Sequence, residues 1–262
     1  MGTNYIAPIW RMPRNTNKDN LSNYSIDFGD GGLAGRYINC GTDLFTDSNI
    51  PSISISVWIK TSAAGVIMSK DLATATNRNF LFQIAGTQLY WQTTTGSTSS
   101  FPDSLTVSAL EFNLLDGEWH HVVVTYNTGS SSDVGEKKIY IDGLEKAAAS
   151  NATFNPIYNK ATVPIEIGRR GDGDRYFYDE MSQVCIFDYA LSSTQVGYLY
   201  NLNNPMVITG AEPIAYWPLG DNSNPNSETG YPNISVSADS VFDFDPTSTP
   251  VSYTHLTLPT TM

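Results

Sequence analysis

Two stretches of the sequence decide the fold: Glu118-Trp-His-His-Val-Val-Val-Thr-Tyr126 and, after a polar break, Lys138-Ile-Tyr-Ile-Asp-Gly-Leu-Glu145. Valines 122–124 are β-branched, so they favour extended backbone and place apolar surface on both faces of a strand. In the second stretch isoleucines alternate with polar residues, which predicts a strand with one buried face. Asp142-Gly143 then supplies a turn, because glycine tolerates positive φ. The two stretches predict a β-hairpin that needs cover above and below.

Further strands follow from the same alternation. Residues 53–59 show it most clearly, with isoleucine or valine at the odd positions and serine or Trp58 at the even ones. Residues 80–84 and 88–92 predict a second hairpin, whose turn contains Gly86. Shorter strands are expected at 24–28, 36–39, 66–70, 163–168 and 181–187.

One short helix is expected at residues 192–200. Ser192 and Gln195 have the spacing of a capping box, in which each side chain satisfies a backbone donor of the other residue. Leu191 and Val196 are placed to form the accompanying hydrophobic staple.

The motifs DGEWHHVVVTYN, KKIYIDG, IEIGRR and YDEMSQVCIFDYALSSTQVGYLYN occur in this order between residues 116 and 201. In that order they resemble the laminin-G-like, or concanavalin A-like, jelly-roll module, and the resemblance covers roughly residues 21–203. It implies an all-β, two-sheet antiparallel sandwich. Modules of this architecture serve adhesion, glycan binding and virion decoration, so the fold alone does not give the function.

The domain organisation is predicted from composition. Residues 1–20 form an irregular lead-in, 21–203 the jelly-roll domain and 204–250 a C-terminal extension. Residues 251–262 resemble translated non-coding sequence and are excluded from the fold. The extension contains IAYWPLGD and SVFDFDP, which resemble the opening of the same module. It is therefore either a truncated second unit or an extra strand on the first sandwich.

Composition and charge limit the partners. The 262 residues carry a formal net charge of −12, which disfavours nucleic acid or an anionic bilayer as a partner, because binding them depends on clustered lysine and arginine. No secretion signal and no membrane-spanning stretch are evident. The join from Tyr200 to Asp221 resembles modules in phage structural and fibre proteins, so we expect a virion or extracellular location, reached by cell lysis. Cys40 and Cys185 form either one disulfide or, more simply, two unpaired thiols.

Catalytic residues are not apparent. A glycoside hydrolase needs two carboxylates a few ångström apart, and the E-x-D-x-x-E motif of laminarinase-like relatives is absent. His120 and His121 are adjacent, so on a strand they point to opposite faces and cannot share one metal. We predict a protein that is not an enzyme.

A calcium site is predicted on the loop Arg169-Arg-Gly-Asp-Gly-Asp-Arg175. Asp172 and Asp174 can turn their oxygens toward one point, and calcium takes six to eight oxygen ligands. The resemblance adds Asp179 and Asp30, which lie where related modules place calcium. The arginines of the loop offer the alternative, a hairpin held by ion pairs.

Glycan binding needs exposed aromatic side chains that stack on sugar C–H faces, with amides or carboxylates beside them. The alternation turns certain aromatic residues away from the core, and two more flank the acidic loop. The predicted ligand-binding residues are Trp58, Tyr90, Gln92, Tyr140, Tyr176 and Tyr178. The predicted partner is a glycan or cell-surface polysaccharide, with virion proteins as further partners. The alternatives are a glycan-cleaving hydrolase of the same fold and a spacer without ligand.

Overall fold

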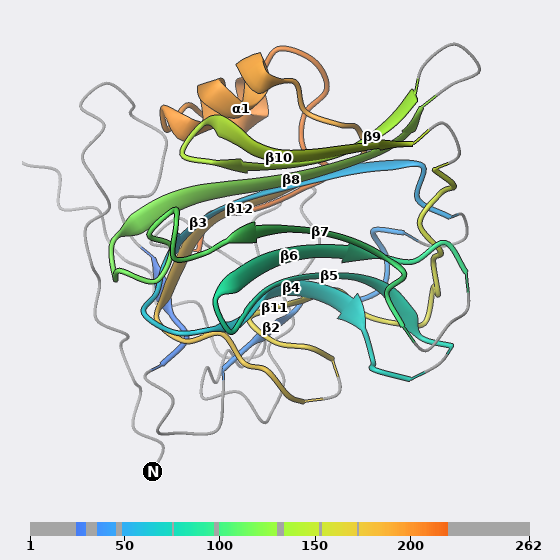
Figure 1. Cartoon of the computed structure of the whole chain (residues 1–262), viewed down its shortest axis with the longest axis horizontal. Helices are drawn as coiled ribbons and strands as arrows, with labels where there is room; N and C mark the ends of the chain where they lie inside the picture. Colours follow the sequence, from blue (N-terminus) through green and yellow to red (C-terminus); the bar gives the residue numbers. More distant parts are fainter. Residues whose placement is uncertain are drawn as a thin grey trace, which may run out of the picture.

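The protein is a two-sheet β-sandwich with a helix on one side, as a computed structural model shows (Figure 1). The structure describes residues 25–29, 36–45, 49–74, 76–96, 100–129, 134–151, 154–171 and 173–219. All strand pairings within the two sheets are antiparallel. The predicted all-β, jelly-roll-like fold with one short helix is confirmed.

The first sheet has seven strands. Its order is β1 (Ile26–Asp27), β12 (Glu180–Phe187), β3 (Ser52–Lys60), β8 (Trp119–Gly129), β9 (Val134–Ile141) and β10 (Leu144–Asn151), and β13 (Ala215–Trp217) also pairs with β12. The predicted central hairpin is β8 and β9, in which Val123 lies opposite Tyr140.

The second sheet has six strands. Its order is β2 (Ile38–Asn39), β11 (Glu166–Ile167), β4 (Gly65–Asp71), β5 (Arg78–Ala85), β6 (Gln88–Thr93) and β7 (Asp103–Ser108). Strands β7 and β10, which the alternation does not predict, each lie at one edge of their sheet. Their sequences, DSLTVS and LEKAAASN, contain few large apolar residues, so they give a weak strand signal.

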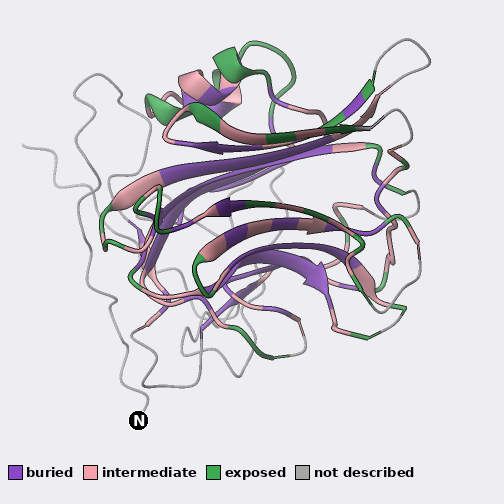
Figure 2. Cartoon of the chain, in the orientation of Figure 1, coloured by how far each residue is buried: buried purple, intermediate pink, exposed green. Residues whose placement is uncertain are grey.

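The core lies between the two sheets and consists of buried apolar residues. Figure 2 shows that the central strands of both sheets are largely buried. Ile55 and Val57 of β3 meet Phe82 and Trp91 of the other sheet within one cluster. The indole of Trp91 donates a hydrogen bond across the gap to the carbonyl oxygen of Thr125, at 3.0 Å. Burial of such large apolar side chains is the main source of stability in a sandwich.

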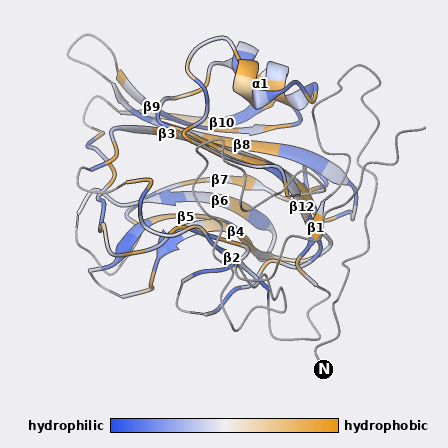
Figure 3. Ribbon diagram, turned by 180° about the vertical axis from the view of Figure 1, so that it is seen from behind, coloured by the Kyte–Doolittle hydropathy of each residue, from blue (hydrophilic) through white to orange (hydrophobic). Residues whose placement is uncertain are grey.

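A second apolar layer covers the outer face of the seven-stranded sheet. Helix α1 (Ser193–Tyr200) begins with the predicted capping box of Ser192 and Gln195. Its Val196 and Leu199 pack with Val123 in a separate buried cluster. The middle of β8, hydrophobic in Figure 3, therefore has cover on both faces, as the valine run predicts.

The segment after the helix returns to the sandwich. A short 3-10 helix, Pro205–Val207, leads to β13, and Trp217 and Leu219 are buried in the main core. The described part of the extension is thus an added strand, whereas residues 220–262 lie outside the described residues. Cys40 and Cys185 are both free and buried. In the described part of the chain, no helix is long and apolar enough to cross a membrane.

Candidate functional site

The outer face of the six-stranded sheet presents polar and aromatic side chains on β6. Leu89 and Trp91 enter the core, so Gln88, Tyr90 and Gln92 point the other way because side chains alternate along a strand. All three are partly exposed. Tyr90 therefore has the orientation expected of a sugar-stacking residue.

Neighbouring strands complete this face. Tyr90 lies between Gln83 of β5 and Thr106 of β7 in the strand register. The amide nitrogen of Gln83 donates to the amide oxygen of Gln92 at 2.8 Å. Thr106 and Ser104 are exposed on the edge strand. We call the surface formed by Tyr90, Gln92, Ser104 and Thr106, together with the buried side chain of Gln83 beside them, the β6 face.

Residues 168–171 and 173–178 cover the sheet beside the β6 face. Their backbone is tied to β4: the Val66 N–H donates to the Arg175 carbonyl oxygen at 2.9 Å, and the Ser69 hydroxyl donates to the Arg169 carbonyl oxygen at 2.9 Å. At Gly65 a Cβ atom would lie 2.5 Å from the Tyr176 carbonyl oxygen, so only glycine permits this close approach. These residues form a wall along one side of the β6 face.

Ion pairs anchor the wall. The Arg169 guanidinium forms two hydrogen bonds with Glu166, at 2.8 and 2.9 Å, and lies over the Tyr37 ring. Arg170 bonds to Asp174 at 2.6 Å and approaches buried Asp71 at 4.0 Å. Arg170 is only 8% exposed. The Arg170 guanidinium is therefore not displayed to a binding partner.

Arg175 connects the wall to the β6 face. Its guanidinium donates to the amide oxygen of Gln83 at 3.2 Å. From the sequence, Arg175 is expected only as one of the arginines that neutralise the loop, and Gln83 is not among the predicted site residues. The alternation in the 80–84 strand was the available signal for Gln83, because it places this residue outward beside Tyr90.

The predicted exposure of Trp58 and Tyr140 is wrong. Both point away from the inter-sheet core, but they are only 6% and 2% exposed. Trp58 stacks on Tyr200 of α1, with ring centres 5.8 Å apart and planes inclined by 12°. Tyr140 packs in the cluster that contains Val196 and Leu199 of α1. The helix layer thus converts this aromatic face into a second core.

Tyr176 and Tyr178 are partly exposed and flank Phe177, which is buried in the core. The Tyr176 side chain interacts with the Arg169 guanidinium, so it belongs to the wall. The structure therefore groups Tyr90 with Gln92 on the β6 face and Tyr176 with the wall beside it.

The described aspartates of the predicted calcium site are engaged elsewhere. Asp174 is held by Arg170, and the Asp179 carboxylate accepts hydrogen bonds from the Ser62 N–H at 2.8 Å and the Ser62 hydroxyl at 3.2 Å. Within the described ranges, no three His, Cys, Asp or Glu side chains are arranged to hold a metal ion. Asp30 and Asp172 lie outside the described residues, so calcium binding remains a prediction. The positions of Asp174 and Asp179 do not fit a shared calcium site.

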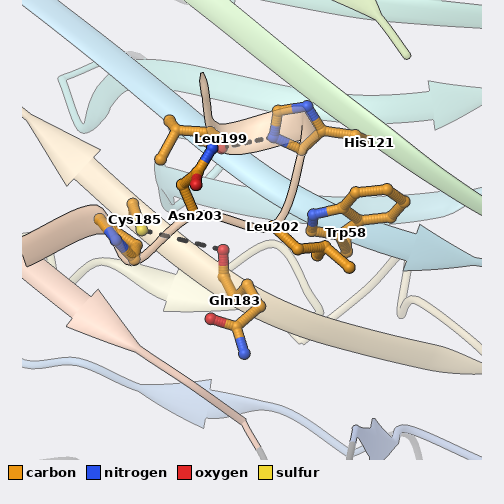
Figure 4. Close-up of a pocket in the computed structure, with 9 residues that line it drawn as sticks. Trp58, His121, Gln183, Cys185, Leu199, Leu202 and Asn203 are labelled. Atoms are coloured by element: carbon orange, nitrogen blue, oxygen red, sulfur yellow. Dashed lines mark hydrogen bonds between the residues drawn. The ribbon is translucent and has the colours of Figure 1, made fainter. Parts of the chain in front are cut away.

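A small pocket of about 10 Å³ lies between α1 and the seven-stranded sheet (Figure 4). This volume is sufficient for about one water molecule. His121 lines this pocket and is 1% exposed. Its Nε2 atom and the Ser56 hydroxyl share a hydrogen bond of 2.8 Å. Burial lowers the pKa of His121 to about 3. The imidazole is thus neutral and inaccessible, so His121 serves to pack the interior.

His120 points to the opposite side of β8 and lies at the rim of the sandwich. Its ring nitrogens face Asp142 Oδ2 at 2.8 Å and Asp116 Oδ1 at 3.3 Å. The hydrogen bond with Asp142 is the main cause that raises the pKa of His120. Both nitrogens are occupied by carboxylates of the chain itself, so neither is available to a substrate.

Comparison with known proteins gives a family for the sequence. Residues 30–197 match the family described as the "Concanavalin A-like lectin/glucanases superfamily". No curated protein sequence matches the chain.

Several solved structures are similar to this chain. A protein from Bacteroides ovatus that is proposed to bind carbohydrate has a TM-score of 0.56 and 15% identity, over 81% of this chain and 57% of that one. A SAP-like pentraxin from Limulus polyphemus has a TM-score of 0.46 and 17% identity, over 67% and 81% of the two chains. The binding domain of botulinum neurotoxin serotype D has a TM-score of 0.47 and 18% identity, over 68% and 42%. At 15% identity, the similarity to the Bacteroides ovatus protein concerns the fold alone.

Proposed function

Because the chain belongs to the concanavalin A-like lectin/glucanases superfamily, we propose that it binds carbohydrate on the β6 face without cleaving it. The observation that carries the proposal is the position of Tyr90. Its ring is partly exposed on an open sheet surface, between strands that carry amide and hydroxyl groups. An aromatic ring with polar groups at its edge suits the alternating C–H faces and hydroxyls of a sugar.

The carboxylates near this face favour binding over hydrolysis. Glycoside hydrolysis uses two carboxyl groups that flank the scissile bond. Asp71 and Glu166 are buried and paired with arginines, and Asp174 is held by Arg170. Among the described residues, no two carboxylates around the β6 face are exposed and free of such ion pairs.

The biological context is also a proposal. The resemblance of the Tyr200–Asp221 join to phage structural and fibre modules supports a role in virion adhesion or decoration, with a cell-surface polysaccharide as the partner. The net charge of −12 supports a partner other than nucleic acid.

A glycan array with the full chain tests the proposal. We expect binding to at least one glycan, and we expect Tyr90→Ala to weaken it about tenfold, or about 1.4 kcal/mol. Tyr198→Ala is the matched control, because Tyr198 is a partly exposed tyrosine in α1, on the other sheet. Silence on all glycans would support a spacer instead. Release of reducing ends from a bound polysaccharide would support a hydrolase.

A further inference from the structure

We infer that the sugar bound at the β6 face is acidic, and that Arg175 binds its carboxylate. This inference rests on the proposed function and adds the chemical class of the ligand. Three independent features support it: the direction of the hydrogen bonds across the face, the pairing of the neighbouring cations, and the fixed backbone of Arg175.

The hydrogen bonds across the face leave donors pointing outward. Arg175 donates to the amide oxygen of Gln83, and the Gln83 amide nitrogen donates to the amide oxygen of Gln92. Both amide oxygens are therefore engaged within the protein. Of the amide and guanidinium groups, the amide nitrogen of Gln92 and the other N–H groups of Arg175 remain for a ligand, and all of them are donors. The hydroxyls of Tyr90, Ser104 and Thr106 also remain, and these can donate as well as accept. Such a surface suits a ligand rich in acceptors.

The other cations of this region are already paired. Arg169 is held by Glu166, and Arg78 and Arg170 both approach Asp71. A second anion would gain little at these positions, because their charges are compensated and mostly buried.

Arg175 differs from these three arginines. Its side chain is 49% exposed, and the nearest carboxylate oxygen among the described residues is Asp174 Oδ1, at 3.9 Å. The other oxygen of Asp174 is held by Arg170 at 2.6 Å. An exposed ion pair at 3.9 Å contributes little, so the guanidinium retains the capacity to bind a ligand carboxylate through two parallel hydrogen bonds.

The backbone of Arg175 is fixed beside the site. Its carbonyl oxygen accepts from Val66 of β4, and its φ angle of +53° lies in the left-handed region. Residues held in this region are over-represented at binding sites, where the surrounding structure imposes them. Gln83, the partner of Arg175, is directly opposite Tyr90 in the sheet. Adjacent strands are about 4.8 Å apart, so one sugar residue can contact both Tyr90 and Arg175.

Matched pairs of acidic and neutral oligosaccharides test the inference. The probes are oligogalacturonate and its methyl ester, a glucuronate-containing oligosaccharide and its carboxyl-reduced form, and sialyllactose and lactose. Dissociation constants are measured for the full chain, Arg175→Gln, Arg175→Lys and Lys138→Gln. The last variant removes the same charge from β9, in the other sheet. Thermal melts check that each variant is folded.

We expect at least one acid to bind about tenfold more tightly than its neutral partner. Arg175→Gln should remove that preference, Arg175→Lys should retain part of it, and Lys138→Gln should leave it intact. Equal binding of acid and neutral forms, or a preference that survives in Arg175→Gln, would overturn the inference and leave carbohydrate binding standing. Absence of binding to every acid and every neutral form would overturn both.

Discussion

Lys137→Met tests the energetic cost of the ammonium group that joins the two sheets. Lys137 lies on β9 with no exposed surface. Its Nζ donates to the Thr93 hydroxyl and the Asp103 carbonyl oxygen in the other sheet, both at 3.0 Å, and lies 3.2 Å from the Asp103 carboxylate. The contacts reduce the cost of burying the charge without removing it.

The magnitude follows from the pKa of Lys137 in the two states. In the folded state, burial lowers the pKa of Lys137 from the ordinary 10.5 to about 8, although the negative charge of Asp103 acts in the opposite direction. Below pH 8 both states hold the proton, and the folded state carries the full cost. As the pH rises from 8 to 10.5, the folded state releases the proton first, so the unfolded state binds more protons and stability increases. These two pKa values give a gain of about 1.3 kcal/mol between pH 7 and pH 9.

Urea unfolding at pH 7 and pH 9 measures this gain. Other titrating groups, such as buried Lys70, are present in both proteins and cancel in the difference between wild type and Lys137→Met. We expect the wild type to gain about 1.3 kcal/mol relative to the variant over this interval. Lys138→Met is the control: partial burial lowers the pKa of Lys138, but Glu136 raises it above its usual value overall, so no gain is expected. A Lys137→Met difference that is the same at both pH values would refute the reasoning.

Three further predictions concern the helix, the covered aromatic face and calcium. Ser192→Ala should destabilise the protein by about 1 kcal/mol through loss of the capping box. Ser193→Ala, one position further on, should leave stability nearly unchanged. Equal unfolding midpoints for the two variants in urea would contradict the role of the cap. Trp58→Ala should lower the free energy of unfolding by about 3–5 kcal/mol, because a buried indole is removed from beneath α1. The same variant should leave glycan affinity at the β6 face unchanged. A selective loss of glycan binding in a stable Trp58→Ala protein would contradict the placement of the binding site on the β6 face. A calcium site completed by Asp30 and Asp172 would raise the free energy of unfolding by about 2.7 kcal/mol at a calcium concentration one hundred times the Kd. Asp174→Asn would remove that gain. Identical thermal melts in calcium and in a chelator would contradict the calcium site.

The fold was predictable because its main signals are local. The valine run and the alternation at residues 53–59 depend only on the two faces of one strand. The capping box likewise lies within four residues, from Ser192 to Gln195. Strands β7 and β10 were missed because edge strands bury less surface, so their sequences need not carry a strong apolar pattern.

The site was less predictable because it depends on what covers each sheet. Alternation turned Trp58 outward correctly, but the residue that covers it, Tyr200, lies far along the chain. One local signal pointed to this cover. Val123 demands burial on the outer face of β8, and Trp58 lies opposite His121 on the adjacent strand, on the same face. A face that contains Val123 is expected to be covered, so the exposure predicted for Trp58 conflicted with the valine run.

The same reasoning explains why the β6 face is the available surface. The outer face of the seven-stranded sheet is apolar at Val123 and Tyr140, and α1 removes it from water. On the six-stranded sheet, the outward residues nearest β4, such as Val66 and Leu81, are buried, and the wall is bonded to β4 there. On β6 and β7 the outward residues become polar and partly exposed. This part of the sheet therefore presents no apolar side chains that another element would need to bury. A ligand that meets this surface therefore finds one aromatic ring with donors beside it, and no large hydrophobic patch that would suit a protein partner.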